Sequence, residues 1–400
     1  MTNNQKVHIC DIDKCMGCGL CEAVCSSSAI EMKIVEGFYR PIINDNCIGC
    51  LACQKNCPAN NHFNIKNDLK NIYRKECYAA WDKDSKMHFL SSSGGLASLL
   101  SKAIIENGGF VVSAQFNYLN QCVEHVLIDK MEELDRNRGS KYVNSNKSGV
   151  YEKVYSRIIE KKCTSLFIGV PCEVYAMKQF LKMKKCQDSM IYVDLLCHGG
   201  ASPLCFNQHI NRISRGKRID DVHFRGGEND CKLVIYSNDS IIYSDYQYAD
   251  LYFNLFMEHV LYQPACYNCI FAGIDRCGDI TLGDFWGLDE TIYNKSKEMG
   301  CNMVLINTDT GNELFDSISG KVEYYKRPIE EAVKGNTTLS EATLYGKGYD
   351  EFWDVVKRSG FHKAAKKVYR LSFLKRYVIS RIRIVLRKKR GLKCGKDNAK

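Results

Sequence analysis

Apolar residues follow two periods along the chain, and the pattern changes at Ser91. From there on, short apolar runs typical of buried strands alternate with stretches of helical period. One helix is predicted over 96–106, closed by the glycines at 108 and 109, and a second over 173–184. Strands are predicted at 110–116, 165–168, 190–196, 279–286 and 303–307. This alternation indicates an α/β domain built around a sheet.

Residues before Ser91 have a different pattern. Short strands are predicted at 7–9 and 30–35, within a cysteine-rich unit, and residues 219–245 later in the chain are predicted to form a hairpin region. The predicted fold class is therefore α+β, with a small N-terminal domain followed by an α/β domain that has a mixed sheet. The predicted division is 1–65, a charged connector at 66–90, the α/β domain at 91–350, and a basic tail at 351–400.

Eight cysteines near the N-terminus form two runs with the same spacing, C-x2-C-x2-C-x3-C. The runs are Cys15, Cys18, Cys21, Cys25 and Cys47, Cys50, Cys53, Cys57. This is the bacterial pattern for two 4Fe-4S clusters, in which the fourth cysteine of each run ligates the other cluster. We therefore expect cluster one to be held by Cys15, Cys18, Cys21 and Cys57, and cluster two by Cys47, Cys50, Cys53 and Cys25. The spacing predicts a ferredoxin-like domain that moves electrons.

Small residues between these ligands fit a cluster-binding loop. Gly17, Gly19, Gly49 and Ala52 let the backbone wrap a cluster and point N–H groups at its sulfurs. A structural zinc site fits less well, because such sites pair two CxxC or CxxC/His units and do not use triplets with a distant fourth ligand. A disulfide framework fits less well still.

Composition restricts the class of protein. The 400 residues are 45% hydrophobic and 26% charged, as in ordinary globular proteins of two or three domains. No signal-peptide core follows Met1, and no uncharged apolar run is long enough to span a bilayer. With 22 cysteines and no export signal, we expect the reducing cytoplasm.

The net charge of +10 is concentrated at the C-terminus. Residues 357–400 carry a net charge of +16, so the rest of the chain is acidic and no nucleic-acid partner is expected. Over 361–390, apolar and basic residues alternate close to helical spacing. Such a helix could lie on the anionic inner face of the membrane, bind a protein partner, or remain solvated.

Two short motifs have the composition of a phosphate-binding loop. Ser91 to Gly95 (SSSGG) directly precedes the helix over 96–106, and the positive end of a helix dipole attracts anions. Gly139-Ser-Lys141-Tyr-Val adds a cation. Ser-Gly turns also cap helices for purely structural reasons.

Four further cysteines could hold a third cluster. Cys172 and Cys197 each follow a predicted strand, where open α/β sheets place their ligands, and Cys266 and Cys269 form a CxxC pair. Cys172 and Cys197 could equally be small buried hydrophobes. Cys277 is a possible substitute ligand, whereas Cys10 and the remaining cysteines are expected to be unliganded thiols. His198 could donate a proton beside a redox centre or orient another group.

Taken in order, these motifs resemble a known family. The ferredoxin runs, SSSGG, GSKYV, GVPCE, CHGG and CYNCIFAGIDRCGDITLGDFWG are similar to those of the family of coenzyme F-420 hydrogenase/dehydrogenase beta subunits, from Cys15 to about Thr308. That family consists of FAD-containing iron-sulfur oxidoreductases. Its members include deazaflavin-dependent subunits, chlorophyll-ring reductases and bacterial proteins associated with polysaccharide biosynthesis.

The resemblance implies cofactors and residue roles. It implies an FAD and a third 4Fe-4S cluster, and it places Arg276, Asp279, Asp284 and Trp286 at the flavin or substrate pocket. The implied flavin-phosphate residues are Ser92, Ser93, Gly94, Gly95 and Lys141. The implied ligands of the third cluster are Cys172, Cys197, Cys266 and Cys269. Two departures concern this cluster: Glu173 stands where the family often has glutamine, and Cys277 is an extra cysteine.

The functional hypothesis is a flavin-dependent iron-sulfur oxidoreductase. Electrons from a low-potential donor, either ferredoxin or a deazaflavin, would pass through 4Fe-4S clusters to FAD and reduce an unidentified substrate, with polysaccharide biosynthesis as the preferred context. The alternative is an electron-transfer subunit that serves a partner enzyme and has no substrate of its own. A radical S-adenosylmethionine enzyme is disfavoured, because the C-x3-C-x2-C triplet is missing.

Overall fold

The N-terminal unit is a small hairpin with cysteine loops. The computed structural model describes residues 7–70, 75–225, 227, 231–296, 299–369 and 378, and all structural statements concern these. Strands β1 (Ile30–Val35) and β2 (Phe38–Ile43) pair in antiparallel fashion. The short helices around them are η1 (Ile12–Lys14), α1 (Leu20–Ala23), α2 (Ala52–Lys55), η2 (Pro58–Asn60) and α3 (His62–Lys70).

An eight-stranded mixed sheet forms the body of the protein. Its order is β13-β3-β12-β11-β7-β6-β4-β5, with parallel pairing from β11 through β7 and β6 to β4 and antiparallel pairing elsewhere. The strands are β3 (Glu76–Asp82), β4 (Val111–Asn117), β5 (Cys122–Ile128), β6 (Ser165–Gly169), β7 (Met190–Leu195), β11 (Ile280–Asp284), β12 (Asn302–Ile306) and β13 (Val322–Arg327). The predicted mixed sheet is confirmed.

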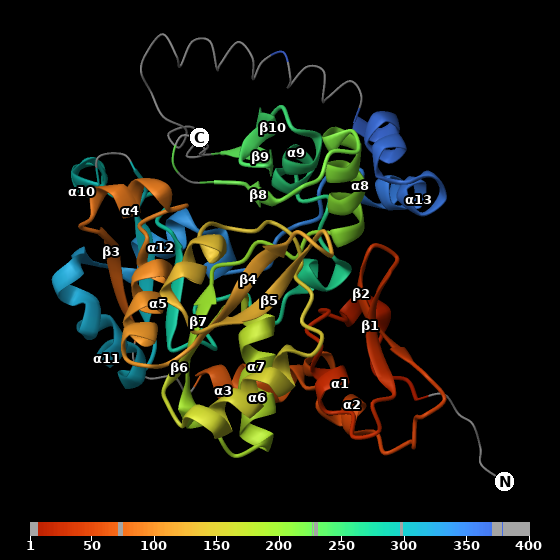
Figure 1. Ribbon diagram of the computed structural model, residues 1–400, viewed down its shortest axis with the longest axis horizontal. Helices are drawn as coiled ribbons and strands as arrows, with labels where there is room; N and C mark the ends of the chain where they lie inside the picture. The colour runs from red at the N-terminus through yellow and green to blue at the C-terminus, as the bar shows by residue number, and fades with distance from the viewer. Residues whose placement is uncertain are drawn as a thin grey trace.

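Helices cover both faces of this sheet (Figure 1). On one face, α5 (Leu96–Glu106) and α11 (Asp309–Ile318) pack their apolar sides on the strands. On the other face, α6 (Val150–Lys161) and α7 (Pro171–Met183) form a core with Leu20 of the N-terminal unit. The N-terminal unit is thus packed on the sheet's helical layer, where α1 contacts α7.

A second, smaller sheet makes its own core. Strands β8 (Asp221–His223), β9 (Lys232–Ser237) and β10 (Ser240–Tyr246) confirm a hairpin region within 219–245 and add a third strand to it. Helices α8 (Pro203–Ser214), α9 (Leu251–Met257) and α13 (Tyr349–Ser359) share a core with this sheet. The remaining helices are α4 (Ser85–Leu90), η3 (Met131–Asn137), η4 (Gln187–Ser189), η6 (Pro264–Asn268), α10 (Glu290–Lys295), η7 (Ser319–Lys321), α12 (Ile329–Gly335) and η8 (Thr337–Leu339).

Most predicted elements are confirmed within one or two residues. The helix expected at 96–106 is α5, and the one expected at 173–184 is α7, which begins two residues earlier because Pro171 suits the first helical turn. The strands predicted at 110–116, 165–168, 190–196, 279–286 and 303–307 are β4, β6, β7, β11 and β12. Apolar periodicity was a sufficient guide for these elements.

The strand predicted at 7–9 is wrong. The segment has no regular secondary structure, and side chains bind its carbonyl groups. Gln54 Nε2 donates to the His8 carbonyl at 3.0 Å, and Asn60 Nδ2 donates to the Ile9 carbonyl at 2.8 Å. Ile9 is buried in the same small core as Ile30. The apolar residue that suggested a strand is therefore required by packing and not by a sheet.

Two predicted boundaries also change. The expected connector at 66–90 supplies β3, which lies between β13 and β12, so the sheet begins before Ser91. Part of the expected tail at 351–400 is core: α13 and residues 361–369 are helical, and Phe352, Phe361 and Ala364 are fully buried. Apart from Val378, the residues of the predicted amphipathic helix beyond 369 lie outside the described residues. Within the part that is described, no helix has both the length and the apolar character to cross a bilayer.

Candidate iron-sulfur site

The four cysteines predicted to hold cluster one line a single cavity. Cys15, Cys18, Cys21 and Cys57 all border it, together with Met16, Met32 and Pro41. Cys18 is buried against the body of the protein, where Tyr151 Oη donates a hydrogen bond of 2.5 Å to its carbonyl. Two widely separated runs therefore converge in the way that the ligand exchange between runs requires.

The cysteines predicted for cluster two lie nearer the surface. Burial raises the pKa of the Cys53 thiol, and its neighbours Cys25 and Cys50 add to this rise, so these three lie together. Cys47 and Cys50 are exposed. Ile48 between them is 69% exposed. Of the two groups, this one faces solvent.

The cysteines suggested for a third cluster come together at the end of the large sheet. Cys172 follows β6 and Cys197 follows β7, and these parallel neighbours end side by side, with Gly169 opposite Asp194. Cys266 and Cys269 approach from η6. Burial raises the pKa of the Cys197 thiol well above its usual value, and the nearby Cys266 and Cys269 raise it further.

A close backbone approach places the CxxC segment beside Cys197. The bridge Ala201–Tyr262 and the hydrogen bond from Gln263 N to Gly200 O, 3.1 Å long, join the two segments. A Cβ on Gly199 would lie 2.3 Å from the Tyr262 ring, so the first glycine of CHGG is needed for this contact. Gly200 N donates to Cys266 Sγ at 3.2 Å, the type of N–H···S contact that tunes cluster sulfurs.

The donor chemistry of this group fits a cluster, and Cys277 stands apart from it. In the described part of the chain, no three His, Cys, Asp or Glu side chains are placed to hold a single metal ion. A cubane is larger than one ion and separates its ligand sulfurs more widely. The Cys277 thiol lies 3.2 Å from the Pro171 carbonyl and 3.5 Å from Asp194 Oδ2. These contacts hold the thiol away from the other four cysteines.

A buried polar network explains why glutamate follows Cys172. Glu173 forms an ion pair with Lys147 at 2.9 Å. Its carboxylate also accepts hydrogen bonds from Ser145 Oγ at 2.9 Å and from Val170 N at 3.0 Å. Burial alone would raise the pKa of the Glu173 carboxyl, but Lys147 and His125 more than offset this and lower it to about 2. A glutamine here would leave the buried Lys147 cation without a counter-charge.

Three single residues join this site to the cluster-one loop. Lys147 Nζ donates to the Gly17 carbonyl at 3.3 Å. Arg40 Nη1 donates to the Cys15 carbonyl at 3.1 Å and to Gln263 Oε1 at 3.0 Å, while Gln263 Nε2 donates to the Met16 carbonyl at 2.8 Å. Sequence reasoning missed all three, because isolated polar residues carry no spacing signal.

The serine–glycine loop suggested for flavin phosphate is partly used by the fold. Ser93 Oγ donates to the Cys301 carbonyl at 3.0 Å. A Cβ on Gly94 would lie 2.3 Å from the Ala80 carbonyl, so this glycine is required by its contact with β3. Gly95 is the N-cap of α5, in the left-handed conformation. Ser92 Oγ accepts from Ser140 N at 2.9 Å, which brings SSSGG and GSKYV together.

Lys141 lies in the second of these loops. Its ammonium donates to the carbonyls of Arg136, Arg138 and Gly139 at 3.3, 2.8 and 3.1 Å. Burial lowers the pKa of this side chain to about 8, while the neighbouring Asp221 partly counteracts the shift. Carbonyl groups satisfy the ammonium, and among the described residues no carboxylate forms an ion pair with it, so it could attract a phosphate.

The other predicted pocket residues divide into two groups. Arg276 forms a buried ion pair of 3.0 Å with Asp194, and Asp279 accepts from Tyr192 N and Thr308 Oγ1, both at 2.8 Å. These two brace the sheet. Asp284 instead pairs with Arg225 at 2.5 Å, and Trp286 two residues later is half-buried.

His198 lies directly after Cys197. Its carbonyl accepts from Thr343 Oγ1 at 2.7 Å, which holds the CHGG turn in place. Burial lowers the pKa of the imidazole, and the nearby His259 lowers it further, so the neutral ring is favoured at neutral pH. A neutral ring beside the third cysteine group can donate one hydrogen bond and accept another.

Comparison with known proteins gives two family matches. Residues 164–332 match the family defined by the C terminus of the beta subunit of coenzyme F420 hydrogenase/dehydrogenase. Residues 14–61 match the 4Fe-4S dicluster domain. The first match contains all four cysteines of the third group, and the second contains both N-terminal runs.

Individual relatives agree with these matches. The chain is 26% identical to the F subunit of F(420)H(2) dehydrogenase of Methanosarcina mazei over 330 residues, covering 79% of this chain and 85% of the relative. Ferredoxin-3 of Nostoc sp. is 36% identical over 66 residues, covering 12% of this chain and 68% of that ferredoxin.

A solved structure is also similar: a chain of the F420-reducing [NiFe] hydrogenase complex from Methanosarcina barkeri has 18% identity and a TM-score of 0.45, covering 75% of this chain and 94% of that one. The order of the two matched regions agrees with the motif order in the sequence. The chain carries a 4Fe-4S dicluster domain, and the region that follows it is related to the beta subunit of coenzyme F420 hydrogenase/dehydrogenase.

Proposed function

We propose that this chain is a flavin-dependent oxidoreductase with three 4Fe-4S clusters and one FAD. One observation carries the proposal: four cysteines from separate segments of the body gather directly beside the cluster-one loop. Lys147 contacts Gly17 of the cluster-one loop and Glu173, which follows Cys172. Gln263 contacts Met16 of that loop and Cys266. A third cluster at this position would continue the chain of redox centres from the dicluster domain into the α/β domain.

Exposure of the cysteines suggests the direction of electron flow. Cys47 and Cys50 of cluster two are exposed, whereas Cys15 and Cys18 of cluster one are buried. A diffusing donor, such as ferredoxin or another low-potential carrier, would reach cluster two first. Electrons would then pass to cluster one, to the third cluster and to the flavin.

FAD would convert single-electron delivery into two-electron chemistry on a substrate, and that chemistry belongs to the cofactor. Lys141 and the Ser92 hydroxyl would bind its phosphates, while Ser93, Gly94 and Gly95 would shape the loop. Asp284 with Arg225, and the neutral His198, are the polar groups that we propose near the substrate. The substrate itself and a role in polysaccharide biosynthesis remain predictions from the motif resemblance.

An electron-transfer subunit without its own substrate is the second candidate. The observation that favours it is the relative from Methanosarcina mazei, which is named as a subunit of a dehydrogenase and of which 85% is covered. In this case the same three clusters would serve a partner enzyme.

Cofactor content tests the proposal first. Protein purified without oxygen should contain one FAD and about twelve iron atoms, as expected for three cubanes. Cys197→Ala should lower the iron by about four atoms and keep the signals of both ferredoxin clusters. A wild-type protein with only eight iron atoms would contradict the proposed third cluster. A wild-type protein without FAD would contradict the proposed flavin site. A reduced flavin that transfers electrons only to a co-purifying partner would select the second candidate.

The basic tail suggests a location on an anionic membrane surface, and we propose it on sequence grounds alone. Each basic residue near such a surface contributes about 1 kcal/mol until salt screens it. Because residues 361–369 belong to the core, the test is a truncation after Tyr369. Full-length protein should sediment with vesicles of phosphatidylserine and phosphatidylcholine, and the truncated protein should not. Equal sedimentation would contradict the membrane proposal.

A further inference from the structure

A fifth cysteine borders the cluster-one cavity. Cys10 precedes both runs and belongs to neither spacing pattern, and the sequence suggested an unliganded thiol. In the structure it lines the same cavity as Cys15, Cys18, Cys21 and Cys57. A cubane needs four cysteines, so this cavity has one thiol more than the cluster uses.

Cys10 lies next to two particular ligands. Of the thiols around this cavity, those of Cys15 and Cys57 interact most strongly with the thiol of Cys10. The thiols of Cys18 and Cys21 have other close neighbours, with Cys15 and Cys57 prominent among them. Any exchange with Cys10 should therefore involve Cys15 or Cys57.

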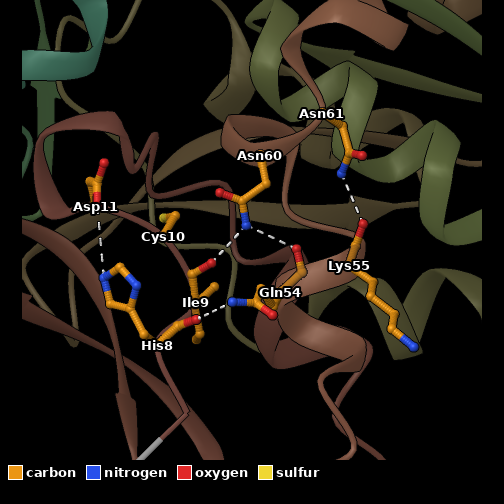
Figure 2. A pocket seen from close by; sticks show the side chains of 8 residues that line it. All are labelled: His8, Ile9, Cys10, Asp11, Gln54, Lys55, Asn60 and Asn61. Atoms are coloured by element: carbon orange, nitrogen blue, oxygen red, sulfur yellow. Dashed lines mark hydrogen bonds and ion pairs between the residues drawn. The ribbon is translucent and has the colours of Figure 1, made fainter.

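The backbone on the N-terminal side of Cys10 is held in place. The carbonyls of His8 and Ile9 accept the side-chain amides of Gln54 and Asn60, as Figure 2 shows, and the Ile9 side chain is buried. On the C-terminal side, Lys14 N donates to the Asp11 carbonyl at 3.0 Å. The thiol is thus presented by a constrained segment, which lowers the entropic cost of bringing it to a metal.

A second cavity lies on the outer side of the same residue. It has a volume of about 340 Å³ and is open to solvent, and its lining includes Cys10, Ile9, Gln54 and Asn60 (Figure 2). Cys10 and Ile9 border both cavities, so they form the wall between solvent and cluster one. Solvent and oxidants would reach the cluster from the side on which Cys10, Cys15 and Cys57 lie.

We propose that Cys10 is a reserve ligand of cluster one, which can replace Cys15 or Cys57 at its iron. In this exchange the Cys10 thiol gives up its proton and its sulfur bonds to the iron. The departing cysteine leaves as a thiolate and takes up a proton. No electron is transferred, and the iron keeps four sulfur neighbours, so a cluster opened from the solvent side can close again.

Alanine variants of the full-length chain, purified without oxygen, test this role. Iron per chain and the EPR spectrum after dithionite reduction are the readouts. Cys15→Ala should keep the wild-type iron content with an altered cluster-one signal. The double variant Cys10→Ala/Cys15→Ala should lose about four iron atoms, one cubane. Cys10→Ala alone should match the wild type.

Cys18→Ala is the matched control in the same cavity. It should lose about four iron atoms whether or not Cys10 is present, because Cys10 lies beside Cys15 and Cys57. Cys57→Ala, with and without Cys10→Ala, repeats the test at the second neighbour. The cluster-two signal and the circular-dichroism spectrum report on folding in each variant.

Three outcomes would overturn the proposal. The first is equal iron content in Cys15→Ala and in the double variant. The second is loss of a cluster in Cys10→Ala alone, because Cys10 would then be a primary ligand. Unfolding of both Cys15→Ala and Cys57→Ala is the third, because a reserve ligand should preserve the cluster. The test compares each variant with the wild type, and the expected differences are the same with or without FAD and the third cluster, so a failure of the proposed function leaves this test intact.

Discussion

The protein assembles its cysteine groups in two different ways. In the ferredoxin-like unit, three of the four cysteines in each group lie within seven residues of sequence, for example Cys15 to Cys21. In the α/β body, Cys172, Cys197 and the pair at 266 and 269 come from three separate segments. The first arrangement depends mainly on a loop, and the second depends on the ends of neighbouring strands. The second should therefore respond more strongly to changes in the core.

The two groups also differ in their electrical surroundings. The cysteines of cluster two lie at the surface, where water screens charge. The body group lies beside the buried pair Lys147–Glu173, whose side chains are 3% and 6% exposed. Removing one partner of a buried pair is far more costly than removing a surface charge.

The largest expected effect comes from Glu173→Leu. Loss of the carboxylate leaves Lys147 buried without a counter-charge, so the variant should lose about 3–5 kcal/mol of unfolding free energy. It should also lose the iron of the third group and keep both ferredoxin signals. Urea denaturation and EPR measure these two changes.

Two variants serve as controls for that prediction. Glu152→Leu removes an exposed carboxylate that pairs with Lys184 at 3.5 Å, and it should change stability by less than about 1 kcal/mol. The double variant Glu173→Leu/Lys147→Met removes both charges and should recover most of the lost stability. If Glu173→Leu is as stable as the wild type, the buried pair does not support the body group.

Gln263→Leu should have the next largest effect, because Gln263 joins the two groups. Its loss leaves the Met16 carbonyl without its donor, at a cost of about 1–3 kcal/mol, while Arg40 Nη1 keeps the carbonyls of Cys15 and Tyr39. Electron transfer from the ferredoxin clusters to the body should slow, which stopped-flow spectroscopy can follow. Gln187→Leu at the surface should leave both quantities unchanged, and an equal loss there would show that the effect is not specific.

Exposure predicts the order in which clusters are lost. A water-soluble iron chelator should remove cluster two roughly tenfold faster than the cluster held by the buried body group. Cys50→Ala removes cluster two and identifies its EPR lines. Simultaneous loss of all signals would mean that the exposure of Cys47 and Cys50 does not decide access.

The smallest expected effect is a pH dependence of flavin binding. Burial lowers the pKa of Lys141 to about 8, so the side chain is cationic below that pH and becomes neutral above it. FAD affinity should therefore weaken as the pH rises through about 8, measured by fluorescence titration of the flavin-free protein. Lys141→Met should bind FAD more weakly without this dependence, and Lys153→Met, at an exposed position of α6, should behave like the wild type. If the pH dependence of FAD affinity is the same in Lys141→Met as in the wild type, Lys141 does not bind the flavin phosphates.

The sequence by itself determined the parts that depend on short-range spacing. Cysteines three or four positions apart must share one loop, so the runs from Cys15 and Cys47 predicted the dicluster domain that the family match confirms. Apolar periodicity also located α5, α7 and the central parallel strands. The apolar pattern that defines each helix or strand lies within that element's own short segment of sequence. GSKYV and SSSGG were recognised as motifs before their contact was known.

Only the tertiary structure decided which distant residues meet. Glu76–Asp82 looked like a charged connector, but sheet order is set by long-range packing, and the segment became β3. Lys147, Arg40 and Gln263 are isolated along the chain, and they gain roles because a buried charge or amide must find partners wherever the fold supplies them. Cys10 lies outside every spacing rule, and it is the cavity shared with Cys15 and Cys57 that places its thiol at cluster one.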